Sequence, residues 1–255
     1  MLLFILIITF IAVAVGLAWF LIAHDRGQRE PVAALWMAAG FGIIAGLTAA
    51  LLENHLISVD NLTPGTAQQT ILVTALTVGA IEEACKFIPL AFVIYKRSYF
   101  NEHTDGVIYF ALAGLGFGVP ENILYTVQFG TKAGMIRVLL TPFFHAATTG
   151  VVGYYLVKRK LAGKSPWSVV VPLVVVMVLH GLYDYGLIAG GFLHTGVALL
   201  ITLGMSAALF VAFFRANERD QDLGLSAVGH NSFCRSCGYA NPQHHLYCTH
   251  CGKNA

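Results

Sequence analysis

The sequence predicts an all-α membrane protein, a polytopic transmembrane bundle of about seven helices with a small C-terminal zinc ribbon. Three observations predict this fold class. Hydrophobic residues make up 57% of the 255-residue chain and charged residues 11%, whereas a soluble domain carries roughly 25% charged residues. The apolar residues fall in blocks of about 20, the length that crosses ~30 Å of hydrocarbon as a helix. Four cysteines lie in two close pairs within the last 22 residues.

The apolar blocks give the individual helices. We predict spans at 2–23, 32–52, 70–94, 106–128, 136–157, 167–189 and 194–214. The first span has no positive residues before it and is followed by Arg26 and Arg29, so it is predicted to be a retained helix and not a cleaved signal peptide.

The loops between these spans predict the orientation. They are alternately rich and poor in Lys and Arg, which places the N-terminus outside and the C-terminal tail in the cytoplasm. The predicted organisation is a membrane domain at 1–214, a polar linker at 215–232 and a zinc ribbon at 233–255. A net charge of +2 argues against nucleic acid as a partner.

Ionisable residues interrupt four successive spans, where each charge costs roughly 2.5–3.5 kcal/mol on insertion scales. Residues of this kind usually face the bundle interior, pair with one another and serve a function. The candidate site residues are Glu82, Glu83 and the supporting Lys86 in the third span, Glu121 and the supporting Asn122 in the fourth, His145 in the fifth, and His180 and Asp184 in the sixth.

Spacing and depth predict that these side chains meet. Glu82 and Lys86 are four residues apart and share a helix face, as do His180 and Asp184. Glu83 is turned about 100° from Glu82, so the two carboxylates point in different directions. Counted from the outer edge of each span, the groups lie in one layer roughly 8–18 Å below the outer surface.

The fourth span predicts a polar pocket beside this layer. Gly114, Gly116 and Gly118 precede Pro120, and a proline removes a backbone donor from the helix. We therefore expect a broken helix at Pro120. Broken helices are tolerated at membrane depth only where they are buried in protein or line a watery cavity.

The residue types favour hydrolysis by activated water. A buried glutamate can act as general base, and a histidine or asparagine can stabilise an oxyanion. No serine or cysteine stands out as a nucleophile, because the neighbouring carboxylates disfavour a thiolate at Cys85. The same two glutamates and two histidines are also suited to a catalytic zinc, so both metal-dependent and metal-free hydrolysis remain open here.

In this order and spacing, the motifs resemble the PrsW family of intramembrane proteases, which is similar to the CAAX prenyl proteases. The motifs are Glu82-Glu83-x-x-Lys86, Phe117-x-x-x-Glu121-Asn122, His145 and His180-x-x-x-Asp184, and they cover about residues 70–190. Glu121 stands where a CAAX protease usually has histidine.

The resemblance implies an intramembrane endopeptidase of the bacterial plasma membrane that cuts membrane-anchored proteins at a peptide bond in or near the membrane. It also implies that Glu82 and Glu83 include the catalytic base. His180 with Asp184 would then bind the substrate carbonyl or the oxyanion. Two other functions remain open on the residues alone. Buried Glu, His and Lys also make proton relays in transporters, and a non-catalytic scaffold can retain a protease fold.

The tail predicts a structural zinc site separate from this layer. Cys234-x-x-Cys237 and Cys248-x-x-Cys251 are ten residues apart, a spacing typical of tetrahedral zinc held by four cysteines. A knot this small has too little core to fold without metal. We expect it to bind a protein partner or to regulate the membrane domain.

Overall fold

The computed structural model describes residues 2–58, 61, 66–222, 237 and 250–251. Within these residues the chain forms seven α-helices and one short π-helix, and it has no strand. The elements are α1 (Leu2–Ala23), α2 (Val32–Leu56), α3 (Gln68–Pro89), η2 (Leu90–Ile94), α4 (His103–Phe129), α5 (Thr131–Ala162), α6 (Trp167–Ala189) and α7 (Gly191–Asp222). The predicted all-helical bundle is confirmed.

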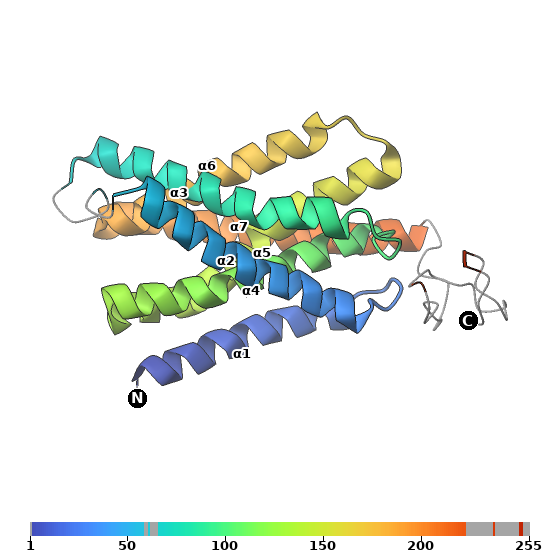
Figure 1. Ribbon diagram of the computed structural model, residues 1–255, viewed down its shortest axis with the longest axis horizontal. Helices are drawn as coiled ribbons and strands as arrows, with labels where there is room; N and C mark the ends of the chain where they lie inside the picture. Colours follow the sequence, from blue (N-terminus) through green and yellow to red (C-terminus); the bar gives the residue numbers. More distant parts are fainter. Residues whose placement is uncertain (1, 59–60, 62–65, 223–236, 238–249, 252–255) are drawn as a thin grey trace.

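Successive helices run in opposite directions along the bundle, so the start of α1 and the end of α7 lie at opposite ends (Figure 1). Five helices are long and apolar enough to cross a membrane, namely α1, α2, α4, α6 and α7. The other two, α3 and α5, are not among these five. Their predicted role as spans therefore stays a prediction.

Helix α4 is the centre of the bundle. In the most apolar stretch of α4, 78% of the residues are buried, against 28–33% for the same stretch of the other four candidate spans. Helix α4 packs most extensively against α5 and α2. Small residues permit this approach. A Cβ atom added at Gly114 would lie 2.1 Å from the carbonyl oxygen of His145, and one at Gly116 would lie 2.1 Å from that of Ala39. The backbones of α5 and α2 thus touch α4.

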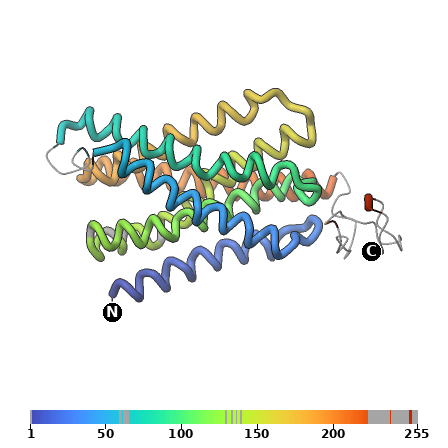
Figure 2. Tube along the Cα trace, viewed as in Figure 1, coloured from blue at the N-terminus to red at the C-terminus, as the bar shows by residue number. Residues whose placement is uncertain are grey.

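A second close contact joins α3 to α6, which run side by side (Figure 2). A Cβ atom added at Gly79 would lie 2.6 Å from the backbone nitrogen of Gly181. Both glycines stand within one turn of ionisable residues, Glu82 on α3 and His180 on α6. The glycine contact therefore brings these two side chains together.

The predicted break at Pro120 is wrong, because α4 is helical from His103 to Phe129. Proline removes one backbone donor, but packing on both sides holds the helix in place. The Asn122 side chain also bonds within the helix, its Nδ2 donating to the carbonyl oxygen of Gly118 at 3.1 Å.

The single predicted span at 70–94 divides at a different proline. Pro89 ends α3, and the π-helix η2 continues the chain. The Tyr95 amide donates to the Leu90 carbonyl at 3.0 Å, five residues back. This wider turn lets the chain continue past a residue that has no backbone donor.

The linker boundary at 215 needs correction, because α7 continues to Asp222. Residues 215–222 belong to the bundle for a specific reason. The carboxylate of Asp220 is buried and accepts hydrogen bonds from the backbone amides of His103 and Thr104 at 2.8 and 2.9 Å. It thereby satisfies free donors at the start of α4. The rest of the predicted linker lies outside the described residues.

The predicted zinc ribbon also lies mainly outside the described residues. Of its four cysteines, Cys234 and Cys248 fall there, while Cys237 and Cys251 are described and exposed. The zinc ribbon therefore stays a prediction.

Candidate active site

The predicted site residues lie together in the bundle interior. All are buried, with exposed fractions of 8% or less, namely Glu82, Glu83, Lys86, Glu121, Asn122, His145, His180 and Asp184. They come from α3, α4, α5 and α6. The prediction that four helices bring these groups to one layer agrees with the contacts that follow.

Lys86 is the hub of the layer. Its Nζ lies 2.9 Å from Glu83 Oε1, 3.4 Å from Glu82 Oε2 and 2.9 Å from His145 Nδ1. An ammonium group has three hydrogens to donate and accepts none, so His145 Nδ1 accepts. The remaining ring nitrogen, Nε2, then carries the hydrogen and donates to Glu121 Oε2.

Glu83 is fully engaged by donors. Its Oε1 accepts from Lys86, from His180 Nδ1 at 2.7 Å and from Thr148 Oγ1 at 3.1 Å. A carboxylate that accepts from one ring nitrogen fixes the tautomer of that histidine and the orientation of its ring. Nε2 of His180 is therefore the nitrogen with a free lone pair.

That lone pair faces two carboxylates. Nε2 of His180 lies 3.3 Å from Glu82 Oε2 and 3.6 Å from Asp184 Oδ2. Both His180 Nε2 and Asp184 Oδ2 are buried and lack a hydrogen-bond partner among the described residues. Three acceptors that face one another repel, unless a cation or a proton lies between them.

The residues present fit a metal ion at this place. One ligand atom each from Glu82, His145 and His180 lie within 4.8 Å of one another, and all three residues are buried. Two histidines and one carboxylate are a donor set typical of catalytic zinc. Both ring nitrogens of His145 are engaged, by Lys86 and by Glu121, so His145 would have to give up one of these contacts to hold an ion. The charges agree, since four carboxylates face only two permanent cations, Lys86 and Arg137.

Glu121 is held by a second cation, Arg137 of α5. Its two oxygens accept from Arg137 Nη2 and from His145 Nε2. Arg137 also donates from Nε to Asn122 Oδ1 at 3.1 Å and lies over the ring of Tyr125. Glu121 and Asn122 are thus fixed as one unit.

A cavity of about 280 Å³ lies between α2, α3 and α4. Glu82 and Glu121 line its inner end, and Glu53, Asn54 and Gln128 line other parts of its wall. A peptide segment in this cavity would meet the carboxylate of Glu82 directly. The cavity therefore connects the buried layer to a space large enough for part of a substrate.

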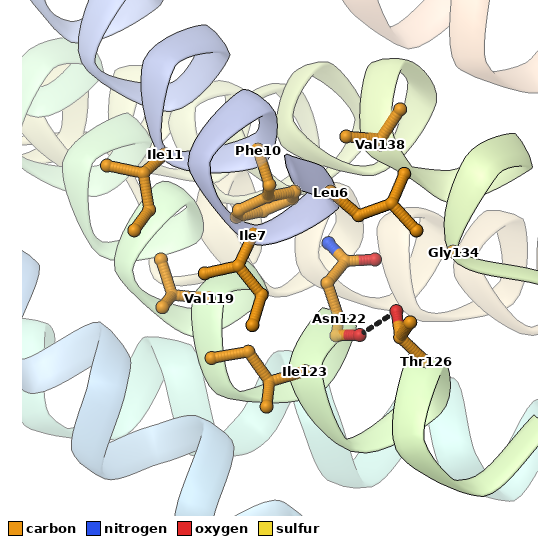
Figure 3. A pocket seen from close by; sticks show the side chains of 10 residues that line it. All are labelled: Leu6, Ile7, Phe10, Ile11, Val119, Asn122, Ile123, Thr126, Gly134 and Val138. Carbon is orange, nitrogen blue, oxygen red and sulfur yellow. Dashed lines mark hydrogen bonds between the residues drawn. The ribbon is translucent and has the colours of Figure 1, made fainter. Parts of the chain in front are cut away.

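On the opposite side of α4 the layer is closed. Figure 3 shows apolar side chains of α1, among them Leu6, Ile7 and Phe10, against Asn122 and Thr126 of α4. The cavity there measures about 10 Å³, room for no more than one water molecule. The larger of these two cavities, and so the wider approach to the polar layer, lies on the α2 side.

Three residues of this region escaped the sequence analysis, namely Glu53, Arg137 and Thr148. The predicted second span ends at 52 and the fifth begins at 136, which put Glu53 and Arg137 at span edges. Helix α5 begins at Thr131 instead, so Arg137 lies inside it. An arginine at the edge of an otherwise weakly charged loop was the available signal for a buried partner. Thr148 had none.

The chain is similar to known proteins over most of its length. Residues 30–216 match the model of the "PrsW family intramembrane metalloprotease". Protease PrsW of Bacillus subtilis (strain 168) is 30% identical over 182 residues, which cover 70% of this chain and 81% of the relative. Protease PrsW of Clostridioides difficile (strain 630) is 28% identical over 186 residues, 70% of this chain and 77% of the relative. No solved structure matches.

The match extends from α2 to α7 and so includes every helix that contributes to the buried polar layer. The prediction of a membrane-embedded peptidase is confirmed. The order of the motifs, the buried donor set and the family match agree, and the chain belongs to the PrsW family of intramembrane metalloproteases.

Proposed function

We propose that this protein hydrolyses a peptide bond of a membrane-anchored protein substrate, with Glu82 as the general base that activates water. The observation that supports this role is the difference between the carboxylates. Glu83 accepts three hydrogen bonds and Glu121 is held by Arg137 and His145. Glu82 has only the long contact to Lys86, faces His180 Nε2, and lines the cavity.

The proposed metal ligands are His145 and His180, with Asp184 close to His180 Nε2. Glu82, whose oxygen lies within 4.8 Å of the two histidine ligand atoms, would stay off the ion and act as the base. When bound, a divalent ion would supply Lewis-acid activation of water and of the scissile carbonyl. The chemistry of the donors favours zinc. With its Nδ1 hydrogen directed to Glu83, His180 presents a lone pair at Nε2, which suits a ligand better than an oxyanion donor.

The remaining residues position these groups. Glu83 orients His180, and Lys86 separates the charges of the two adjacent glutamates while holding His145. Glu121 holds the other side of the His145 ring. Glu82 would take a proton from water and pass it to the leaving nitrogen, as expected of a base that becomes an acid in the second step.

We further propose the orientation and the role of the tail. The start of α1 and the end of α7 lie at opposite ends of the bundle (Figure 1), which agrees with the orientation that the alternating loop charges predict. The N-terminus then lies outside the bacterial plasma membrane and the tail in the cytoplasm. There the tail cysteines Cys234, Cys237, Cys248 and Cys251 would hold a structural zinc and present a surface for a protein partner.

The test compares the wild type with Glu82→Gln and His180→Ala. Each protein is purified, reconstituted into vesicles of phosphatidylethanolamine and phosphatidylglycerol, and incubated with a library of single-span bacterial membrane proteins. Cleavage products are identified by mass spectrometry. The matched controls are Glu218→Gln and His55→Ala, because both side chains are exposed and lie away from the layer.

The expected result is cleavage by the wild type and both controls, and none by the two site variants. General acid–base catalysis contributes roughly 10²–10⁴-fold, so Glu82→Gln should fall by at least that factor. Wild-type rates in Glu82→Gln would overturn the assignment of the base. Full activity after metal removal, checked by the metal content of the protein, would overturn the assignment of the ligands.

A further inference from the structure

The cavity beside Glu82 has a third carboxylate on its wall that the proposed chemistry does not use. Glu53 lies on α2, and the cavity is lined at its inner end by Glu82 and Glu121 of the active site. With about 280 Å³, the cavity is near the lower end of the ~300–1,000 Å³ of ligand pockets. It is large enough for a few substrate side chains but not for a whole helix.

Glu53 has an oxygen with no partner. Its Oε1 is buried and makes no hydrogen bond to the described residues. The nearby cations are committed elsewhere, Lys86 to Glu82, Glu83 and His145, and Arg137 to Glu121 and Asn122. A carboxylate oxygen that is buried without a cation or donor is costly, so this oxygen of the half-buried Glu53 is suited to a partner that binds transiently, as a substrate does.

Helix stability does not explain Glu53 either. It stands in the last turn of α2, where its carbonyl accepts from the Ile57 amide. A negative side chain near the C-terminal end of a helix opposes the helix dipole, which favours cations there. Glu53 therefore lowers the stability of the fold in two ways, through its buried oxygen and through its negative charge at the C-terminal end of α2. Such a cost is typical of residues that serve a function.

The walls of the cavity indicate what would pair with Glu53. Val78, Phe117 and Leu124 give an apolar surface, and the side-chain amides of Asn54 and Gln128 give polar groups. An apolar surface with a carboxylate suits a long aliphatic side chain that ends in a cation. Lysine and arginine have that structure. The carboxylate of an aspartate or glutamate in the substrate would be repelled by Glu53, Glu82 and Glu121 together.

We propose that Glu53 determines substrate specificity by binding a lysine or arginine side chain close to the scissile bond. This inference rests on the proposed function, because it requires that substrate enters the cavity beside Glu82. In the proposed orientation α2 ends at the outer face, so the basic residue lies on the outer side of the substrate span. Outer flanks are generally poor in Lys and Arg, which would make this a selective feature.

The experiment uses the full-length protein in vesicles of phosphatidylethanolamine and phosphatidylglycerol. The probes are single-span peptides derived from one protein that the wild type cleaves, with each position of the outer third changed in turn to Lys, Gln or Glu. The relative kcat/KM of the three residues is measured at every position. The variants are Glu53→Gln and Glu53→Lys, with Glu218→Gln as the matched control and thermal unfolding as the check of folding.

The wild type and Glu218→Gln should prefer Lys over Gln by about tenfold at one position and should cleave the Glu peptide least. Glu53→Gln should bring the Lys-to-Gln ratio at that position close to one, and Glu53→Lys should reverse the order so that Glu is preferred. A general structural effect would change all three rates together and leave the order intact.

Three outcomes would overturn the inference, and they are distinguishable. Cleavage by a folded Glu53→Gln protein with an unchanged preference for Lys, or a wild type without preference at any position, refutes the role of Glu53 alone. A wild type that cleaves no membrane protein in the library refutes the proposed function and this inference together.

Discussion

The sharpest prediction concerns Glu83→Gln, because the structure separates its role from that of the adjacent Glu82. Glu83 Oε1 accepts from Lys86 at 2.9 Å, His180 Nδ1 at 2.7 Å and Thr148 Oγ1 at 3.1 Å. Glutamine keeps the shape and one acceptor oxygen but removes the charge. The hydrogen bonds that residue 83 accepts from Lys86 and His180 should therefore become weaker.

The magnitude follows from these contacts. A hydrogen bond to a charged group is worth about 1.5–3 kcal/mol and a neutral one about 0.5–1.5 kcal/mol. With two such bonds weakened, the free energy of unfolding should fall by about 2–3 kcal/mol, and the Tm by roughly 4–12 °C. Loss of the group that orients His180 should also lower metal affinity or activity by about 10–100-fold.

The assay measures thermal unfolding, metal content and cleavage of Glu83→Gln and Glu82→Gln in parallel. Glu82 has one long contact, to Lys86 at 3.4 Å, and lies 3.3 Å from the His180 lone pair. Its neutralisation relieves repulsion, so Glu82→Gln should keep or raise the Tm while it abolishes cleavage. Glu83→Gln should therefore lower the Tm, whereas Glu82→Gln should not.

One result would refute this reasoning. If Glu82→Gln were destabilised by 2 kcal/mol or more, on the scale of a buried charge-assisted hydrogen bond, while Glu83→Gln unfolded like the wild type, then the hydrogen bonds of Glu83 would not hold the site. The assignment of base and positioning residue would then have to be exchanged.

Three further predictions concern separate parts of the molecule. Arg137→Met leaves the buried Glu121 without its cation and should cost about 3–5 kcal/mol, most of which Glu121→Gln should restore in the double variant. Burial and the neighbouring Asp105 raise the pKa of Glu102 to about 9, so the folded protein holds a proton there that the unfolded chain releases above about pH 4.3. Wild-type stability should therefore fall as pH rises between these values, and the Tm advantage of Glu102→Gln should grow from pH 6 to pH 8. Finally, His180→Ala should remove one metal ion per chain and serine substitution of the four tail cysteines another, as measured by elemental mass spectrometry.

Each of these has a matched control and a contrary outcome. Lys132→Met removes an exposed cation of α5 and should leave the Tm unchanged; an equal loss in both variants would argue against a buried ion pair. Glu218→Gln keeps Glu102 and should follow the wild-type dependence on pH, and a Glu102→Gln advantage that shrinks from pH 6 to pH 8 would contradict the sign. His55→Ala should keep all metal, whereas full metal content in His180→Ala would exclude this histidine as a ligand.

The amino-acid sequence alone determined that this is a helical membrane protein and which ionisable residues are buried in its interior. Composition and block length predict membrane-spanning helices, because a helix satisfies all of its backbone hydrogen bonds within one segment, as the lipid requires. The ionisable residues stood out because each is costly at membrane depth. Their spacing along each helix then predicted that Glu82, Glu121, His145 and His180 would meet, as their contacts now show.

Only the tertiary structure decided which contacts each of these residues makes, and the proposed roles rest on those contacts. Glu82 and Glu83 are equivalent in sequence, and their difference arises from which donors the neighbouring helices supply, Thr148 from α5 and His180 from α6. The pairing of Arg137 with Glu121, and the place of Glu53 on the cavity wall, likewise depend on how the helices pack. Local patterns specify a helix and its apolar face, but contacts between helices depend on side chains distant in the chain, and these set the function of each carboxylate.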